Sequence, residues 1–160
     1  MGCIVGRIET RLQELGITLP SPAAPVANYV AFVSHGGLVT ISGQLCLGPD
    51  GKLAPEHVGT LGAGIEPDVA KAAAKLCAIN LIDQLRAAVG DLDKVARCIR
   101  LGGFIASTGS FTGQAGVMNG ASDLMVEVFG DAGRHARSTI GVAALPLGAC
   151  VEVEGLFALE

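Results

Sequence analysis

Residues 137–159 read RSTIGVAALPLGACVEVEGLFAL and contain two apolar runs separated by a Pro-Leu-Gly turn. In the second run, valine and glutamate alternate from Val151 to Glu154, which is the two-residue period of a strand with one apolar face. Both runs carry β-branched residues, and the proline and glycine between them favour a turn. The stretch therefore predicts two strands, residues 137–145 and 150–159, joined as a hairpin.

The alternation also assigns faces to these strands. On the second strand we expect an apolar face of Val151, Val153, Phe157 and Leu159, opposite Glu152 and Glu154. On the first strand we expect a packing face of Ile140, Val142 and Ala144, opposite Arg137, Thr139, Gly141 and Ala143. One face of the sheet then carries small residues, an arginine and two glutamates. Because buried charge is costly, that face suits a subunit interface or a site better than a dry core.

Helical spacing occurs in three other stretches. Residues 65–89 predict a long helix, with Pro67 in its first turn, Gly90 after its last turn, and an apolar stripe of Ile65, Val69, Ala72, Leu76, Ile79, Ile82, Leu85 and Val89. A second helix, which ends at Gly130, is predicted from the spacing of Val117, Ala121, Leu124, Met125 and Val128. A short amphipathic helix is expected at about residues 4–16.

Three further runs complete the order of elements. Residues 29–34 and 38–45 predict a hairpin, because only a His-Gly-Gly link separates them, and residues 94–107 predict one strand. The order after the N-terminal helix is therefore β-β-α-β-α-β-β. Its simplest arrangement is one α+β domain over residues 1–160, in which a single mixed sheet carries both helices on one face. The helix at about 4–16 is an extension of that domain.

The composition indicates a globular chain with little charge. Apolar residues make up 50% of the chain and charged residues 16%, so a lone copy has little polar surface and we expect an oligomer. The formal net charge is -4 and no block of lysine or arginine occurs, so nucleic acid is not an expected partner. No apolar run reaches membrane-spanning length, so no membrane partner is expected either.

The cysteines and histidines indicate a reducing compartment and no metal. The five cysteines lack Cys-x-x-Cys spacing, and they are Cys3, Cys46, Cys77, Cys98 and Cys150. With no secretory signal expected at the N-terminus, we predict buried free thiols in a cytoplasmic protein. The three histidines, His35, His57 and His135, are far apart in sequence, and no residues have metal-ligand spacing. We therefore expect no metal site.

The C-terminal stretch resembles the signature of the Rid family, also called YjgF. That signature is an Arg-Ser pair, here Arg137-Ser138, followed by an apolar strand, a Leu-Pro pair, here Leu145-Pro146, and a Val-Glu-Val-Glu strand. Within this signature the chain has Thr139 where many members have cysteine.

Two other parts of the chain are also similar to this family. Ser42-Gly43-Gln44 matches a Ser-Gly-Gln motif on the second strand, and Tyr29 lies thirteen residues before Ser42, as the site tyrosine of the family does. Asn119 matches a recurrent family asparagine. The resemblance covers about residues 25–160. Ala27-Asn28 replaces a usual Gly-Pro, and Ser122-Asp123-Leu124 replaces usual aromatic residues, which indicates a divergent branch with an altered pocket wall.

The resemblance implies a chorismate-mutase-like fold and a homotrimer with sites in clefts between subunits. It also implies an enzyme, because family members hydrolyse reactive 2-imino acids, formed by pyridoxal-phosphate enzymes, to 2-oxo acids and ammonia. The implied ligand is a small imine or enamine that carries a carboxylate. No cofactor is implied, because the imine carbon is already electrophilic.

The resemblance also implies roles for individual residues. Arg137 would bind the substrate carboxylate through its planar guanidinium, helped by the backbone N–H of Thr139. Glu152 would orient or deprotonate the attacking water, or pass a proton to the leaving nitrogen. Tyr29 would close the pocket, whose other residues would be Ser42, Gly43, Gln44 and Asn119.

Each role has a structural alternative. Arg137 would be a structural residue if it paired with Glu152 or Glu154 across the predicted hairpin. Tyr29, the only tyrosine, would be a core aromatic if it were buried, and Ser42 and Asn119 have the residue types of turns and caps. At the level of function, the alternatives are a non-catalytic trimer that binds a small carboxylate, and a ribonuclease or translation inhibitor. The acidic composition argues against the last of these.

Overall fold

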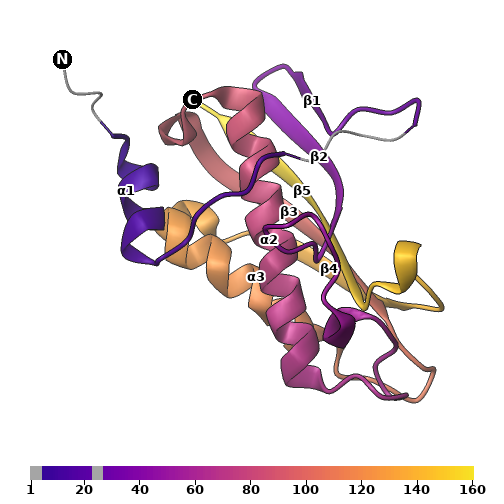
Figure 1. Cartoon of the computed structure of the whole chain (residues 1–160). Helices are drawn as coiled ribbons and strands as arrows, with labels where there is room; N and C mark the ends of the chain where they lie inside the picture. The colour runs from indigo at the N-terminus through magenta and orange to yellow at the C-terminus, as the bar shows by residue number, and fades with distance from the viewer. Residues whose placement is uncertain (1–4, 23–26) are drawn as a thin grey trace.

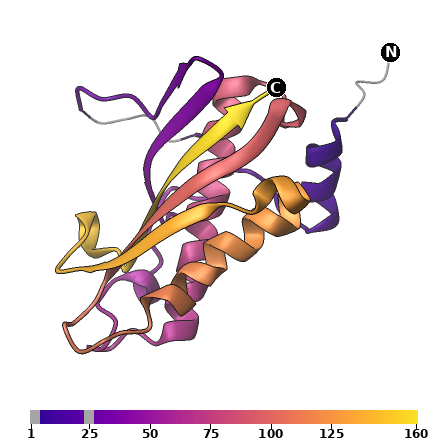
Figure 2. The same cartoon turned by 180° about the vertical axis from the view of Figure 1, so that it is seen from behind.

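A mixed sheet of five strands forms the centre of the protein, and two long helices pack on one of its faces (Figures 1 and 2). The computed structural model describes residues 5–22 and 27–160. Its helices and strands are α1 (Arg7–Glu14), β1 (Phe32–His35), β2 (Leu38–Leu45), α2 (Pro67–Val89), β3 (Val95–Ala106), α3 (Gln114–Phe129), β4 (Ala136–Val142) and β5 (Val151–Leu159). The strand order is β1-β2-β5-β3-β4, and only β3 and β4 are parallel. The predicted α+β architecture is confirmed.

The helix α2 ends where the sequence predicts and begins at Pro67, two residues later than predicted, and its buried stripe also differs. Pro67 lies in the first turn, and Gly90 follows the helix with a φ of 75°, a conformation that favours glycine. The apolar residues that α2 buries are small for the most part: Ala70, Ala73, Ala74, Cys77, Ala78, Leu81, Ile82 and Leu85. Ala72, which the prediction placed in the stripe, is exposed. The prediction followed the larger side chains, whereas close packing against the sheet selects the small ones.

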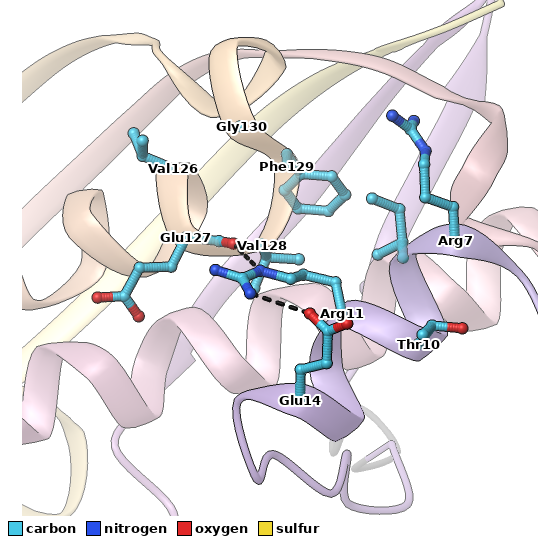
Figure 3. A pocket seen from close by; sticks show the side chains of 10 residues that line it. Arg7, Thr10, Arg11, Glu14, Val126, Glu127, Val128, Phe129 and Gly130 are labelled. Atoms are coloured by element: carbon cyan, nitrogen blue, oxygen red, sulfur yellow. Dashed lines mark hydrogen bonds and ion pairs between the residues drawn. The ribbon is translucent and has the colours of Figure 1, made fainter.

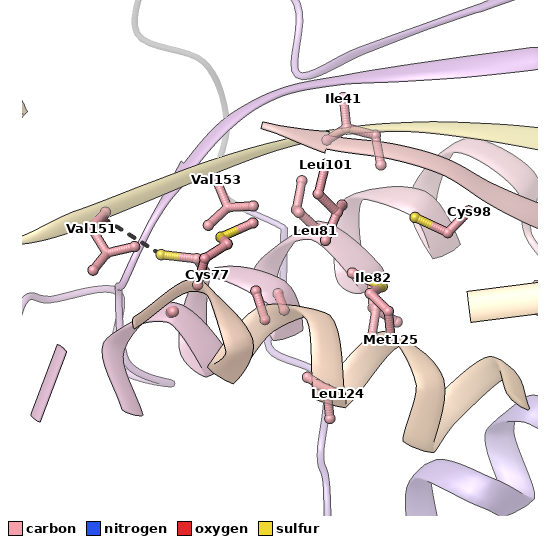
Figure 4. Packing of buried hydrophobic residues seen from close by; sticks show 14 of the residues in the cluster. Ile41, Cys77, Leu81, Ile82, Cys98, Leu101, Leu124, Met125, Val151 and Val153 are labelled. Carbon is pink, nitrogen blue, oxygen red and sulfur yellow. Dashed lines mark hydrogen bonds between the residues drawn. The ribbon is translucent and has the colours of Figure 1, made fainter. Parts of the chain in front are cut away.

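The core lies between α2, α3 and the sheet. Figure 4 shows Cys77, Leu81 and Ile82 of α2 packed against side chains of three strands, which include Ile41, Leu101, Val151 and Val153. The helices α2 and α3 approach each other at Gly120, where a Cβ atom would overlap the carbonyl oxygen of Lys71. Only glycine fits this contact without moving the α2 backbone.

The predicted C-terminal hairpin is wrong. β4 pairs with β3 in parallel, from Arg100 opposite Ala136 to Ala106 opposite Val142, and β5 lies on the other side of β3. The connection from β4 to β5 instead pairs with the loop between β2 and α2. Val58 of this loop forms a β-bridge with Ala149, and the Cys150 N–H donates to the His57 carbonyl. The Pro-Leu-Gly turn is thus part of a wide crossover rather than of a tight hairpin.

The faces predicted for β5 are confirmed, and those predicted for β4 are wrong. Val151, Val153 and Phe157 are fully buried beneath the helices, and Glu152 and Glu154 alternate with them on the open face. On β4, Arg137 pairs with the fully buried Leu101 and so faces the helices.

The reversal on β4 has a physical cause in the tight packing of α3. Ile140 is 52% exposed on the open face. A Cβ atom at Gly141 would lie 2.5 Å from the Ser107 hydroxyl and 3.0 Å from the Gln114 amide nitrogen. At position 141 the helix side of this edge strand therefore has room only for a small residue, and side-chain size was a misleading guide to the faces.

The open face of the sheet, seen in Figure 2, carries apolar residues that no described helix covers. Val33, Leu38 and Ile140 are 56%, 40% and 52% exposed, and each shares this face by strand alternation.

Among the residues described, no helix combines the length and the apolar character that a membrane span needs.

The short N-terminal helix is confirmed as α1, with tighter bounds than predicted. Ile8 and Leu12 are its buried residues. The Asp93 carboxylate accepts from the backbone N–H groups of Arg7 and Ile8, at 2.8 Å each, and these bonds hold the pKa of Asp93 below its usual value. Asp93 thus caps α1 from a distant part of the chain.

Candidate functional site

Arg137 lies against α3 and not against an acidic residue. Its Nη1 donates to the Ser122 hydroxyl at 3.0 Å, and its Nη2 donates to the Ala115 carbonyl at 3.2 Å. Across residues 5–22 and 27–160, no carboxylate lies within ion-pair distance of it. The alternative of an ion pair with Glu152 or Glu154 is therefore wrong, and the half-buried guanidinium is held by two neutral oxygen atoms.

Ser122 is itself held by a histidine. Its hydroxyl lies 3.0 Å from His135 Nε2, and His135 Nδ1 lies 2.6 Å from the Gly133 carbonyl. Sequence analysis named Ser122 only as part of an altered pocket wall and did not assign His135 to the site. The available signal was spacing, because Ala115 and Ser122 are seven residues apart and so share one side of a helix.

Asn119 and Thr139 complete this set of residues. Asn119 lies inside α3, because the helix begins at Gln114, and its position between Ala115 and Ser122 places it on the side that Arg137 spans. Thr139 follows Arg137 on the same face of β4. Its Oγ1 is buried and has no hydrogen-bond partner in the described part of the chain. We call Arg137, Thr139, Asn119 and Ser122 the arginine group.

A second set of predicted residues meets where β2 and β5 pair. The register between these strands shifts between Ile41 and Gln44, so β2 has an irregularity at Ser42 and Gly43. A Cβ atom at Gly43 would overlap Glu152 Oε1, so only glycine leaves room for this carboxylate. Burial raises the pKa of Glu152, and the neighbouring Glu154 carboxylate raises it further.

A hydrogen bond from Ser42 connects β2 to the segment that contains Tyr29. The Ser42 hydroxyl donates to the Val30 carbonyl at 2.7 Å, and Gln44 Nε2 donates to the Ser42 carbonyl at 2.9 Å. Tyr29 is 54% exposed, so the alternative of a core tyrosine is wrong. Gln44 pairs with the buried Val153 and lines a small hollow with Asn80 of α2, so it lies on the helix face. We call Tyr29, Ser42, Gly43 and Glu152 the glutamate group.

Arg137 and Glu152, one from each group, lie on opposite faces of the sheet. Glu152 pairs with Phe104 on β3, and Phe104 pairs with the exposed Ile140 on β4, so these residues share the open face. Arg137 shares the other face with Leu101. A single chain therefore does not bring Arg137 and Glu152 into one pocket.

One hollow in the described structure lies away from both groups. It has a volume of about 500 Å³ and lies between α1 and the C-terminal end of α3 (Figure 3). Arg11 crosses it, donating to the Glu127 carbonyl at 2.8 Å and pairing with Glu14 at 3.0 Å. None of the predicted site residues lines it. These contacts are sufficient to explain the hollow as the place where α1 docks on α3.

The described cysteines belong to the core. Cys46, Cys77, Cys98 and Cys150 are free and buried, as predicted, and Cys3 lies outside the described residues. Burial raises the pKa of the Cys77 thiol, and it raises that of Cys98 to about 12. Over the described ranges, no three His, Cys, Asp or Glu side chains are arranged to hold a metal ion.

The chain is similar to one protein family, to a protein of Trypanosoma cruzi and to several solved structures. Residues 9–159 match the model of a family described as "YjgF/chorismate_mutase-like, putative endoribonuclease". Protein TCP17 of Trypanosoma cruzi is 48% identical over 97% of this chain and 96% of its own length. The crystal structure of the protein Atu1372 from Agrobacterium tumefaciens is 45% identical, with a TM-score of 0.86 over 96% of this chain and 94% of that one. RidA from the Antarctic bacterium Psychrobacter sp. PAMC 21119 is 28% identical, with a TM-score of 0.59 over 89% and 96% of the two chains.

Proposed function

Because the chain belongs to the YjgF family, we propose that it is a deaminase that hydrolyses 2-imino or enamine acids to 2-oxo acids and ammonia. Support comes from the site residues and from the similarity to a protein that is named RidA. The proposed substrate is a small imine with a carboxylate on the adjacent carbon.

The observation that carries this proposal is that Arg137 contacts only neutral acceptors among the described residues. A guanidinium has five N–H donors, and the described contacts use two of them, both with neutral acceptors. Its positive charge is therefore not compensated by any acid among the described residues of its own chain. A planar cation with free donors favours a carboxylate, which it binds with two parallel hydrogen bonds. The backbone N–H of Thr139 is the second donor that we propose.

The chemistry then requires water and one proton carrier. With the carboxylate on Arg137, the oxygen of a water molecule attacks the imine carbon, and the electron pair of the C=N bond moves to nitrogen. Glu152 takes a proton from the water and passes it to this nitrogen, which gives an intermediate with a hydroxyl and an amino group on the same carbon. Glu152 then takes the hydroxyl proton and passes it to the amino nitrogen, the C–N bond breaks, ammonia leaves, and the C=O bond of the 2-oxo group forms. The raised pKa of Glu152 suits this role, because a carboxylate that holds its proton more tightly is a stronger base.

We also propose that the working unit is a homotrimer in which Arg137 of one copy meets Glu152 of another. The opposite-face placement of Arg137 and Glu152 supports a site shared between copies. The exposed Val33, Leu38 and Ile140 on the open face support an oligomer that covers them. The cytoplasm is the compartment that we propose.

The direct test is turnover of freshly generated 2-iminobutanoate, followed as the rate at which 2-oxobutanoate forms beyond the uncatalysed rate. Sizing of the same preparation by light scattering gives the number of copies. An increase in rate that depends on Arg137 supports the deaminase. A well-folded trimer that leaves the rate unchanged over a range of imino acids contradicts it.

A second candidate function is non-catalytic binding of a small carboxylate. The arginine group favours it, because these residues lie on one face of one chain and need no glutamate to bind an anion. A Glu152→Gln variant separates the two functions. The deaminase loses turnover in this variant and still binds 2-oxobutanoate, whereas a pure binding protein has no turnover to lose.

A further inference from the structure

We infer that Ser122 and His135 are positioning residues that fix the orientation of the Arg137 guanidinium for carboxylate binding. This inference rests on the proposed function, because it concerns how Arg137 is held when it binds a substrate. Neither residue touches the reacting atoms in the proposed chemistry, so each acts through Arg137.

For a neutral His135, the direction of each hydrogen bond in this network follows from its donors and acceptors. The Gly133 carbonyl can only accept, so His135 Nδ1, at 2.6 Å, must donate. In the neutral imidazole, Nε2 is then an acceptor, and it receives the Ser122 hydroxyl hydrogen at 3.0 Å. The lone pairs of the Ser122 oxygen are left to accept from Arg137 Nη1, also at 3.0 Å. The result is a one-way chain from Arg137 through Ser122 and His135 to a backbone carbonyl.

The far end of this chain is fixed in place. Gly133 is buried, and a Cβ atom there would overlap the carbonyl oxygen of Met125, so the turn before β4 lies directly on the α3 backbone. His135 itself precedes Arg137 by two residues. The histidine and serine therefore connect the start of β4 to α3 through side chains, next to the residue whose orientation matters.

This arrangement leaves one edge of the guanidinium for a ligand. One N–H of Nη1 and one of Nη2 are bound to α3 by Ser122 and by the Ala115 carbonyl. The other donors remain for a carboxylate, and their direction depends on both bonds being present. An arginine side chain has several rotatable bonds, so loss of the serine bond lets the free donors sample other directions and weakens binding.

The test uses ligands with and without a charge. The dissociation constants of 2-oxobutanoate and of its neutral amide are measured by calorimetry for the parent protein and for Ser122→Ala. We expect the dissociation constant of 2-oxobutanoate to rise about tenfold, which corresponds to about 1.4 kcal/mol. Binding of the neutral amide should be unchanged. In kinetics, KM for the imine should rise by a similar factor while kcat changes little.

Ser138→Ala is a matched control. Ser138 follows Arg137 in sequence, and its hydroxyl accepts from Arg100 at 3.0 Å, as that of Ser122 accepts from Arg137. Ser138 lies on the other face of β4. Ser138→Ala should leave the preference for the carboxylate over the amide unchanged. Two His135 variants test the second step: glutamine keeps an acceptor near the position of Nε2 and should bind like the parent protein, and leucine should behave like Ser122→Ala. His135→Leu also serves as the test if Ser122→Ala does not fold.

The outcomes separate this inference from the proposed function. If the parent protein has turnover that Arg137→Ala abolishes, but Ser122→Ala and His135→Leu keep the parent KM and preference for the carboxylate, the positioning role is wrong and the deaminase stands. Equal losses for the charged ligand and the neutral amide also overturn the role, because they indicate a general structural effect. If the parent protein neither binds 2-oxobutanoate nor turns over imines, the proposed function fails and the inference fails with it.

Discussion

Arg137 and Glu152 lie on opposite faces of one sheet, with the strand β3 between the strands that carry them. Arg137 contacts α3, whereas Glu152 lies beside Gly43 on the open face. A reaction that needs both residues must therefore use two copies of the chain. This relationship makes the oligomer part of the chemistry and leads to the first prediction.

Two inactive variants should restore activity when they are assembled together. In a site with Arg137 from one copy and Glu152 from another, the mixture of Arg137→Ala and Glu152→Gln produces some sites with both native residues. Random assembly of equal amounts gives each native residue in half of the sites, so about a quarter of the parent activity should return. The measurement is turnover after the two variants are unfolded and refolded together.

Each variant refolded alone, and the parent protein treated in the same way, are the controls for this mixing experiment. Native mass spectrometry with a tag on one variant verifies that mixed assemblies form. If mixed assemblies form and remain as inactive as the single variants, the two residues do not act together across copies.

Arg137→Ala alone should fold and lose at least about 100-fold in activity, because a charge-assisted contact of about 3 kcal/mol is removed. The loss should also appear as weaker binding of 2-oxobutanoate. Arg134→Ala is a suitable comparison, since the Arg134 side chain is 71% exposed and pairs with Asp131. An exposed pair of this kind contributes little. Undiminished turnover in Arg137→Ala would mean that Arg137 has no role in catalysis.

The fold could be predicted from sequence to a large extent, because the signals were local. The spacing of apolar residues gives α2 and α3, and the short His-Gly-Gly link gives the β1–β2 hairpin. The position of β4 could not be obtained in this way. β4 pairs with β3, and its connection to β5 bridges at Ala149 to Val58, which is far away in sequence.

The candidate site was predictable in its residues but not in its geometry. Motif resemblance identifies Arg137, Gly43 and Glu152, and the structure shows that a side chain at Gly43 would displace the Glu152 carboxylate. The face of Arg137 was missed because alternation gives two sets of residues without saying which one is buried. The roles of Ser122 and His135 were missed because their importance comes only from contact with Arg137.

Two glycine substitutions in α3 should have opposite effects on stability. Gly120→Ala places a methyl group on the Lys71 carbonyl and should lower the free energy of unfolding by about 1–3 kcal/mol. Gly116→Ala meets no atom within 4 Å and should raise it by about 0.5–1 kcal/mol, because alanine favours a helix. Urea unfolding of both variants measures the difference. Equal effects would contradict the close α2–α3 contact at Gly120.

Gly43→Ala should damage the glutamate group. The added methyl group overlaps Glu152 Oε1, so the carboxylate must move, and we expect a fall in kcat with only a small change in binding of 2-oxobutanoate. Gly109→Ala is the control, because a Cβ atom at Gly109 meets nothing within 4 Å. Adding Glu152→Ala to Gly43→Ala should restore any stability that the single change loses. Normal kcat in Gly43→Ala would show that the carboxylate does not act from this position.

The pH dependence of activity should report the environment of Glu152. Burial and then Glu154 raise the pKa of Glu152 above its ordinary value of 4.5, and the proposed base is the ionised form. The fall of kcat/KM at low pH should therefore lie above pH 4.5, and Glu154→Gln should move it to lower pH by removing a like charge. A profile that Glu154→Gln leaves in place would contradict the coupling of the two carboxylates.

The same raised pKa has a consequence for stability with a defined sign. A carboxyl group whose pKa is higher in the folded chain binds its proton more tightly there, so its contribution is present at low pH and is lost as pH rises through the folded-state value. Glu152→Gln removes the cost of holding a charge in this half-buried place. The variant should therefore be more stable than the parent protein at pH 7 and should gain less at pH 4, as measured by urea unfolding at fixed protein concentration. Equal gains at both pH values would mean that the carboxylate has no raised pKa in the folded chain.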